Sequence, residues 1–80
     1  MFVVYILYSP KFDRFYVGMS SSFKDRLKSH NSGQVKSTKA FTPWELFHSE
    51  DYPTRIEARF REKYFKTSAG RRWRKDNLGM

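Results

Sequence analysis

The stretch FVVYILY, residues 2–8, decides the fold of this chain of 80 residues. Almost every position in it is apolar, and most are β-branched or aromatic, which predicts a strand covered on both faces and therefore a central one. Turn chemistry at residues 9–14 (SPKFDR) separates it from a second strand at residues 15–19 (FYVGM). The two strands together predict a hairpin.

The second strand leads into a helix and then a loop. Three serines, Ser20–Ser22, offer hydroxyl N-caps for a helix that ends at about Asn31. Phe23 and Leu27 stand about one helical turn apart, so they give this helix a narrow buried stripe. Residues 32–43 are rich in Ser, Gly, Lys, Thr and Pro, and this composition predicts an exposed loop.

A third strand and a second helix complete the predicted order. Alternation at residues 44–48 indicates the strand, and residues 54–57 (TRIE) fit a capping box at the start of the helix. We expect the helix to end by Ala69-Gly70, where glycine suits a left-handed cap, and residues 71–75 to form a last short turn. We expect five residues on the buried face of the helix: Ile56, Phe60 and Tyr64 at four-residue spacing, joined by Ala58 and Phe65.

The order β-β-α-β-α predicts an α+β fold. A chain of this length has room for one core, which predicts a single domain over residues 1–80 with a basic C-terminal segment from about residue 70. Met1 leads directly into the apolar run, without the features of a secretory signal, and this favours a cytoplasmic protein. The apolar run is far shorter than a membrane span needs, so no membrane association is expected.

Charge and composition narrow the function classes. The chain has 16 Lys and Arg against 8 Asp and Glu, a net charge of +8, and 19% of its residues are aromatic. The aromatic content argues against a disordered basic tail, and the lack of Cys excludes a disulfide scaffold and a thiolate zinc site. The charge favours a polyanionic partner, with nucleic acid ahead of an anionic membrane surface. The alternative is that the charge only aids solubility.

Two tyrosines and a basic pair are the first candidates for chemistry. Tyr5 and Tyr16 lie on the two strands of the hairpin, where tyrosine is ordinarily half-buried packing. Gly18 interrupts the second strand and marks either a bulge or the close approach of another group. Arg26 and His30 stand one helical turn apart. Arginine can hold a phosphate and histidine can move a proton, whereas the alternative is a solvated basic face.

Glu62 stands in the sequence RFREK, an acid among bases. One interpretation is an ion pair with Lys66, one helical turn further along. The other is a carboxylate ligand for a hard divalent cation such as Mg²⁺. A single carboxylate leaves both interpretations open.

A family resemblance connects these residues. The chain resembles the GIY-YIG nuclease superfamily through five positions in order: Tyr5 in VVY, Tyr16 in YVG, Arg26, His30 and Glu62. The intervals between them also agree with that family, and the resemblance extends over about residues 2–75. Val3 and Val4 stand where the first family motif has Gly and Ile, and Asn77 is the only candidate for a later polar residue found in some members.

The resemblance implies a three-stranded antiparallel sheet flanked by helices, and an endonuclease that hydrolyses DNA with one divalent metal ion, Mg²⁺ or Mn²⁺. It implies that Glu62 binds the metal and that Tyr5 or Tyr16 is the general base. His30 would assist the proton relay, and Arg26 would bind the phosphate. The implied enzyme is structure-selective or nonspecific, with DNA repair or recombination as its setting.

Further basic residues fit contacts to a phosphate backbone. They are Lys36, Lys39, Lys63, Lys66, Arg71, Arg72, Arg74 and Lys75. Nothing in the chain resembles a base-reading module, so no sequence specificity is predicted, and the choice between DNA and RNA stays open. The rival hypotheses are a non-catalytic nucleic-acid-binding module with the same fold, and a nuclease subunit that a larger protein partner targets.

Overall fold

A three-stranded antiparallel sheet with the strand order β2-β1-β3 forms the centre of the computed structural model, which describes residues 1–80. The elements are β1 (Phe2–Ser9), β2 (Arg14–Ser20), α1 (Phe23–Asn31), the short 3-10 helix η1 (Lys39–Phe41), β3 (Glu45–Tyr52), α2 (Arg55–Phe65) and α3 (Ser68–Leu78). The predicted hairpin, the central position of the first strand and the α+β class are confirmed. None of the helices has the length and apolar character needed to cross a bilayer.

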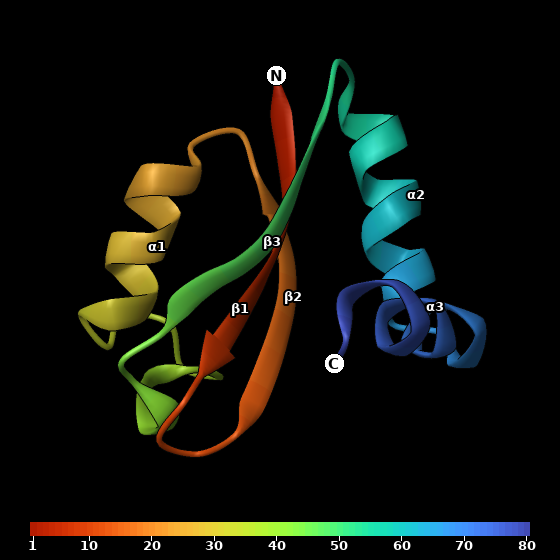
Figure 1. Cartoon of the computed structure of the whole chain (residues 1–80). Helices are drawn as coiled ribbons and strands as arrows, with labels where there is room; N and C mark the ends of the chain where they lie inside the picture. The colour runs from red at the N-terminus through yellow and green to blue at the C-terminus, as the bar shows by residue number, and fades with distance from the viewer.

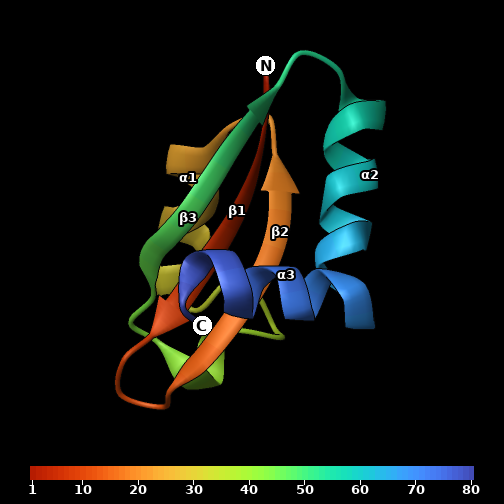
Figure 2. The ribbon, with the colours of Figure 1, turned by 45° about the vertical axis from the view of Figure 1, so that its right-hand side comes forward.

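The sheet separates two helical layers (Figure 1), with α1 on one face and α2 and α3 on the other. Figure 2 shows α3 crossing in front of the strands while α1 lies behind them. Side chains alternate along β1, so Val4 and Ile6 pack with Phe65 on the α2 side, whereas Tyr5 and Leu7 belong to a second buried cluster on the α1 side. The fold therefore has two small cores that share β1.

The buried face of α2 differs from the prediction. Ala58 and Phe65 are fully buried, but Ile56 and Phe60 are each 77% exposed. Tyr64, the third residue of the predicted four-residue spacing, is half-buried and packs against the core, so the prediction is wrong for Ile56 and Phe60 only. The face toward the sheet is completed by Arg61, whose guanidinium lies 4.5 Å from the centre of the Phe65 ring. An arginine can cover apolar surface in this way because its stem and planar head stack on aromatic rings.

The predicted helix end at Ala69-Gly70 is also wrong. The helix α2 ends at Phe65, and α3 begins after Thr67, whose hydroxyl accepts a hydrogen bond from the Gly70 amide at 3.0 Å. Gly70 lies inside α3, where a Cβ would overlap the carbonyl oxygen of Tyr64. Glycine is therefore needed for the close approach of two helices and not for a left-handed cap. The predicted turn at residues 71–75 belongs to α3.

The two predicted helix starts differ in their capping. The Thr54 hydroxyl accepts a hydrogen bond from the Glu57 amide at 3.3 Å, which confirms the N-cap; the Glu57 carboxylate accepts from the Thr54 hydroxyl at 2.9 Å and not from the Thr54 amide, so the reciprocal half of the capping box is not formed. Ser22 stands at the N-cap of α1, but its hydroxyl makes no capping hydrogen bond. The Ser20 hydroxyl instead accepts from the Ser22 amide at 3.0 Å, which closes the turn before the helix. The predicted strand at residues 44–48 is longer than expected and corresponds to β3.

Candidate active site

Tyr5 and Tyr16 lie close together on the hairpin because Gly18 makes room for them. Gly18 pairs with Tyr5 in the register of β1 and β2. A Cβ at Gly18 would lie 2.6 Å from the Tyr5 hydroxyl oxygen and 3.1 Å from the Tyr16 ring. The ring centres of the two tyrosines are 6.5 Å apart. Of the two interpretations of this glycine, close approach is confirmed, and the β1–β2 pairing is regular without a bulge.

His30 lies behind Tyr5 in a buried chain of hydrogen bonds. Its Nε2 is 3.1 Å from the Tyr5 hydroxyl, and its Nδ1 is 2.8 Å from the Thr38 hydroxyl. The Thr38 hydroxyl in turn lies 3.4 Å from the Val35 carbonyl oxygen, to which it donates. The Thr38 oxygen is thereby the acceptor for an Nδ1 proton, which leaves Nε2 of His30 free to accept the proton of the Tyr5 phenol.

Burial shapes the acid–base behaviour of this chain. The pKa of His30 is lowered by burial and by the positive charge of Arg26, so the imidazole is neutral at neutral pH. Burial raises the pKa of Tyr5, and Arg26 opposes that rise. Thr38 is 1% exposed, so the loop predicted at residues 32–43 is not exposed throughout. The Thr38 carbonyl also accepts from the indole of Trp44 at 3.0 Å, which holds this part of the loop in place.

A pocket of about 420 Å³ is lined by residues of the edge strand β2 and by residues from both helical layers. Four of the five residues predicted for the site line it: Tyr5, Tyr16, Arg26 and Glu62. They come from β1, β2, α1 and α2 respectively. The fifth, His30, is fully buried and reaches the pocket only through the Tyr5 hydroxyl. The structure therefore brings all five predicted residues together around one pocket.

Glu62 has one polar partner in the structure. Its carboxylate lies 3.4 Å from the Lys66 ammonium, and its side chain is only 15% exposed. The ion pair offered by the sequence as one interpretation is therefore present. No group of three or more His, Asp and Glu side chains that could hold a metal ion is found. A lone carboxylate in an open pocket fits Mg²⁺, which keeps several waters and often takes only one or two carboxylates.

The sequence interpretation missed two arginines. Arg55 and Arg59 line the pocket together with Glu62. They precede Glu62 on α2 by two turns and one turn, so they share its side of the helix. That spacing was visible in the sequence, and it would have identified them once Glu62 was chosen. The pocket consequently presents three guanidinium groups, counting Arg26, around a single carboxylate.

None of the eight bases predicted to contact a phosphate backbone lines this pocket. Lys66 is paired with Glu62, and Arg74 is partly buried with no hydrogen-bond partner for its Nε. Burial, with the nearby charge of Arg71, lowers the pKa of Arg74. The other predicted bases are exposed: Lys36, Lys39, Lys63, Arg71, Arg72 and Lys75. Asn77 also lies outside the pocket and donates to the Trp73 carbonyl at 2.9 Å.

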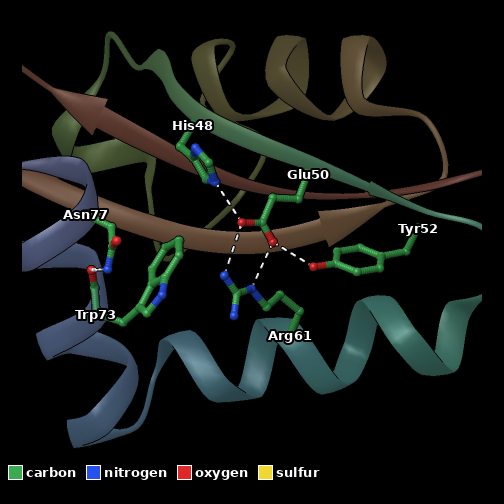
Figure 3. A network of polar contacts seen from close by, with 6 residues as sticks. All are labelled: His48, Glu50, Tyr52, Arg61, Trp73 and Asn77. Atoms are coloured by element: carbon green, nitrogen blue, oxygen red, sulfur yellow. Dashed lines mark hydrogen bonds and ion pairs between the residues drawn. The ribbon is translucent and has the colours of Figure 1, made fainter.

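A polar network attaches α2 to β3 (Figure 3). The Glu50 carboxylate on β3 accepts two hydrogen bonds from Arg61, at 2.9 and 3.3 Å, and one from Tyr52 at 2.7 Å. His48 lies 2.9 Å from the same carboxylate. Burial acts to raise the pKa of Glu50, but the hydrogen bonds and the charge of Arg61 lower it to about 2. Because Arg61 precedes Glu62 in α2, this network also fixes the helix that carries the pocket carboxylate.

The sequence of this chain also matches a known family of proteins. The family model of the GIY-YIG catalytic domain matches residues 1–77, nearly the whole chain. The chain therefore belongs to the GIY-YIG family, which is a family of nucleases.

Its similar relatives are small bacterial proteins. The chain is 42% identical over 53 residues to a UPF0213 protein of Bacillus pumilus, covering 65% of this chain and 54% of that protein. A UPF0213 protein of Bacillus licheniformis is 40% identical over 52 residues, covering 64% of this chain and 54% of that protein. The chain thus spans about half the length of the curated relatives it matches. The solution NMR structure of a UPF0213 protein from Bacillus halodurans has a TM-score of 0.57 and 30% identity, over 98% of this chain and 85% of that one.

Proposed function

We propose that this protein is a metal-dependent endonuclease that hydrolyses phosphodiester bonds of DNA. It is either selective for a DNA structure or nonspecific, and it does not recognise a particular sequence. The observation that carries the proposal is the shared pocket of Tyr5, Tyr16, Arg26 and Glu62, with His30 bonded to the Tyr5 hydroxyl behind it. Repair or recombination of branched DNA is the cellular setting that suits such an enzyme.

The arginines of the pocket bind the scissile phosphate in this proposal. Arg26 projects from α1 on one side, and Arg55 and Arg59 project from α2 on the other. Guanidinium groups stay charged at all relevant pH values and can bind phosphate oxygens through two parallel hydrogen bonds. A phosphate held from both sides is oriented, and the negative charge that develops on its oxygens during the reaction is stabilised.

Glu62 holds the divalent cation, Mg²⁺ or Mn²⁺, in this proposal. The bound ion supplies polarisation of a phosphoryl oxygen and neutralisation of the leaving oxygen. Binding requires the Glu62 carboxylate to exchange its contact with the Lys66 ammonium, which is long at 3.4 Å and leaves Lys66 53% exposed. An ion pair with such an exposed partner contributes little, so a divalent cation competes with it readily.

The tyrosines and His30 handle the proton. The Tyr5 phenol gives its proton to Nε2 of neutral His30 while the Tyr5 oxygen takes a proton from the attacking water. The hydroxide forms the new P–O bond as the ester P–O bond breaks, and the leaving oxygen takes a proton from solvent. Tyr16, whose ring lies beside that of Tyr5, orients the water. Burial raises the pKa of Tyr5, and Arg26 favours the phenolate because it opposes that rise.

Cleavage of duplex, flap and branched DNA with Mg²⁺ or Mn²⁺ tests this proposal. Glu62→Gln and Arg26→Ala should each reduce the single-turnover rate by about 100-fold or more, since each removes charge stabilisation from the reacting phosphate. The matched controls are Glu45→Gln, an exposed carboxylate on β3, and Lys24→Ala, an exposed base on α1.

Unchanged rates in both site variants would refute the assignment of this site, whether the DNA is cut elsewhere on the protein or by a contaminating nuclease. Salt-dependent binding without any cleavage, and without an effect of metal on affinity, would instead identify a binding module.

A further inference from the structure

The outer face of α2 exposes a large apolar surface. Ile56 and Phe60 are each 77% exposed, and neither side chain contributes to the two cores. With Tyr64 they line a groove of about 610 Å³ along α2, the helix that packs on one face of the sheet in Figure 1. Contiguous exposed apolar surface that is rimmed by polar side chains is typical of binding sites.

A row of three basic side chains lies beside this apolar surface and lines the same groove. Arg55, Arg59 and Lys63 recur every four residues along α2, so they stand in one line on the helix. None of the three forms an ion pair within the chain, and no acidic residue lines the groove. The groove therefore offers unpaired positive charge next to exposed aromatic surface.

The groove adjoins the candidate active site. Arg55 and Arg59 line both the groove and the pocket that contains Glu62. A helix with its side chains is about 10–12 Å across, so a strand of a few nucleotides can pass from the pocket over these arginines to the outer face. The two arginines would contact phosphates along that path.

We propose that the outer face of α2 binds unpaired bases next to the scissile bond, with the Phe60 ring as the stacking surface and Ile56 beside it. This proposal rests on the proposed function of the pocket. Exposed aromatic rings stack on unpaired nucleobases of any sequence. The adjacent row of basic side chains binds the phosphates of the same nucleotides. The nuclease would then select DNA in which a single-stranded segment adjoins the cleavage position.

Charge favours nucleic acid over a second copy of this chain as the occupant. Each molecule carries a net charge of +8. Pairing two such faces would bring two rows of three positively charged side chains together, and these would repel each other. A polyanion, by contrast, satisfies both the apolar and the basic part of the groove at once. Self-association through Phe60 is accordingly the alternative outcome that the experiment must recognise.

Binding to a fluorescein-labelled flap DNA, measured by anisotropy in EDTA so that no turnover occurs, tests the proposal. Phe60→Ala should weaken binding about 5- to 150-fold, the range expected for the loss of one base–aromatic stack. Phe60→Trp should restore the affinity, and its added indole fluorescence should be quenched by the DNA. The matched control is Phe12→Ala, which removes another exposed aromatic ring in the turn between β1 and β2.

Abasic sites identify the contacted base. A flap in which one unpaired nucleotide near the branch lacks its base should bind the wild-type protein less tightly, but should bind Phe60→Ala no less tightly than the complete flap does. Equal losses in both proteins, or unchanged affinity of Phe60→Ala, would overturn the proposal. Failure of the wild-type protein to bind the flap would also overturn the proposal. Self-association of the wild-type protein through Phe60, with DNA binding that does not depend on Phe60, would overturn it as well.

The cleavage assay separates this proposal from the proposed function. If the wild-type protein binds the flap through Phe60 but never cuts it, the hydrolytic function fails while the binding face stands. If Phe60→Ala binds and cuts every flap as the wild-type protein does, the binding face fails while the nuclease stands. Thermal unfolding should be nearly unchanged in Phe60→Ala because the side chain is exposed.

Discussion

Replacement of Gly18 by alanine should inactivate the protein while leaving it folded. The new methyl carbon would lie 2.6 Å from the Tyr5 hydroxyl oxygen and 2.7 Å from the ring carbon that bears it. Because an ordinary contact begins near 3.4 Å, the Tyr5 phenol must retreat by about 0.8 Å. Tyr5 is 1% exposed, so it can retreat only by moving its neighbours in the core on the α1 side.

Both stability and rate should respond to this displacement. Overpacking of a buried site typically costs about 1–3 kcal/mol of unfolding free energy. The rate should fall further, by about 100-fold, since a shift near 1 Å at a reacting group has that effect and the 3.1 Å hydrogen bond to His30 would be strained. The measurements are single-turnover cleavage of flap DNA, thermal unfolding, and the NMR signals of the His30 ring.

Gly79→Ala is the matched control. Gly79 ends α3 at a φ of +70°, and a Cβ there would have no neighbour within 4 Å. This variant should lose stability through backbone strain, about 1 kcal/mol, without loss of rate. Wild-type cleavage by Gly18→Ala, or an equal loss of rate in both variants, would refute the argument that the close approach of Tyr5 to β2 sets the geometry of the site.

Two other substitutions test the groups that support the site. Thr38→Val keeps the shape of a buried side chain but removes the acceptor of the His30 Nδ1 proton. The cleavage rate should therefore fall about 10-fold or more, and the nitrogen chemical shifts of His30 should report a changed tautomer. Thr38→Ser should restore both the rate and the chemical shifts. Glu50→Gln should lower the unfolding free energy at pH 7 by about 2 kcal/mol. Because the pKa of Glu50 falls from 4.5 to about 2 on folding, the wild-type protein holds this stability above pH 4.5 and loses it as the pH falls from 4.5 toward 2. Denaturant titrations across that range should show a smaller pH dependence in Glu50→Gln, and identical curves would contradict the role given to Arg61.

Local chemistry predicted most of the sheet, and a family pattern predicted the residues of the candidate site. The apolar run at residues 2–8 had to be covered on both faces, and turn residues marked the hairpin that places Tyr5 beside Gly18. The five site residues were identified by a family pattern and not by geometry, because tyrosines on strands and a lone glutamate are ordinarily packing and ion pairs. Only the fold brings Glu62 from α2 to the pocket lined by Tyr5 and Arg26.

The errors on α2 have a common physical cause. Apolar spacing identifies a buried stripe only when the buried residues are apolar, and here Arg61 occupies part of that stripe. Its guanidinium lies 4.4 Å from the centre of the Trp73 ring and is bonded to Glu50, contacts that no local pattern shows. Gly70 was likewise misinterpreted, since its requirement comes from the Tyr64 carbonyl across the helix junction.

The two separate cores have a consequence for how the protein loses activity. The pocket takes Arg26 from the layer on one face of the sheet and Glu62 from the layer on the other, with the edge strand β2 as their common wall. Either layer can loosen locally at a lower free energy than the whole sheet needs to open. Cleavage should therefore disappear at denaturant concentrations at which the β-sheet is still intact, so that inactivation and unfolding have different midpoints.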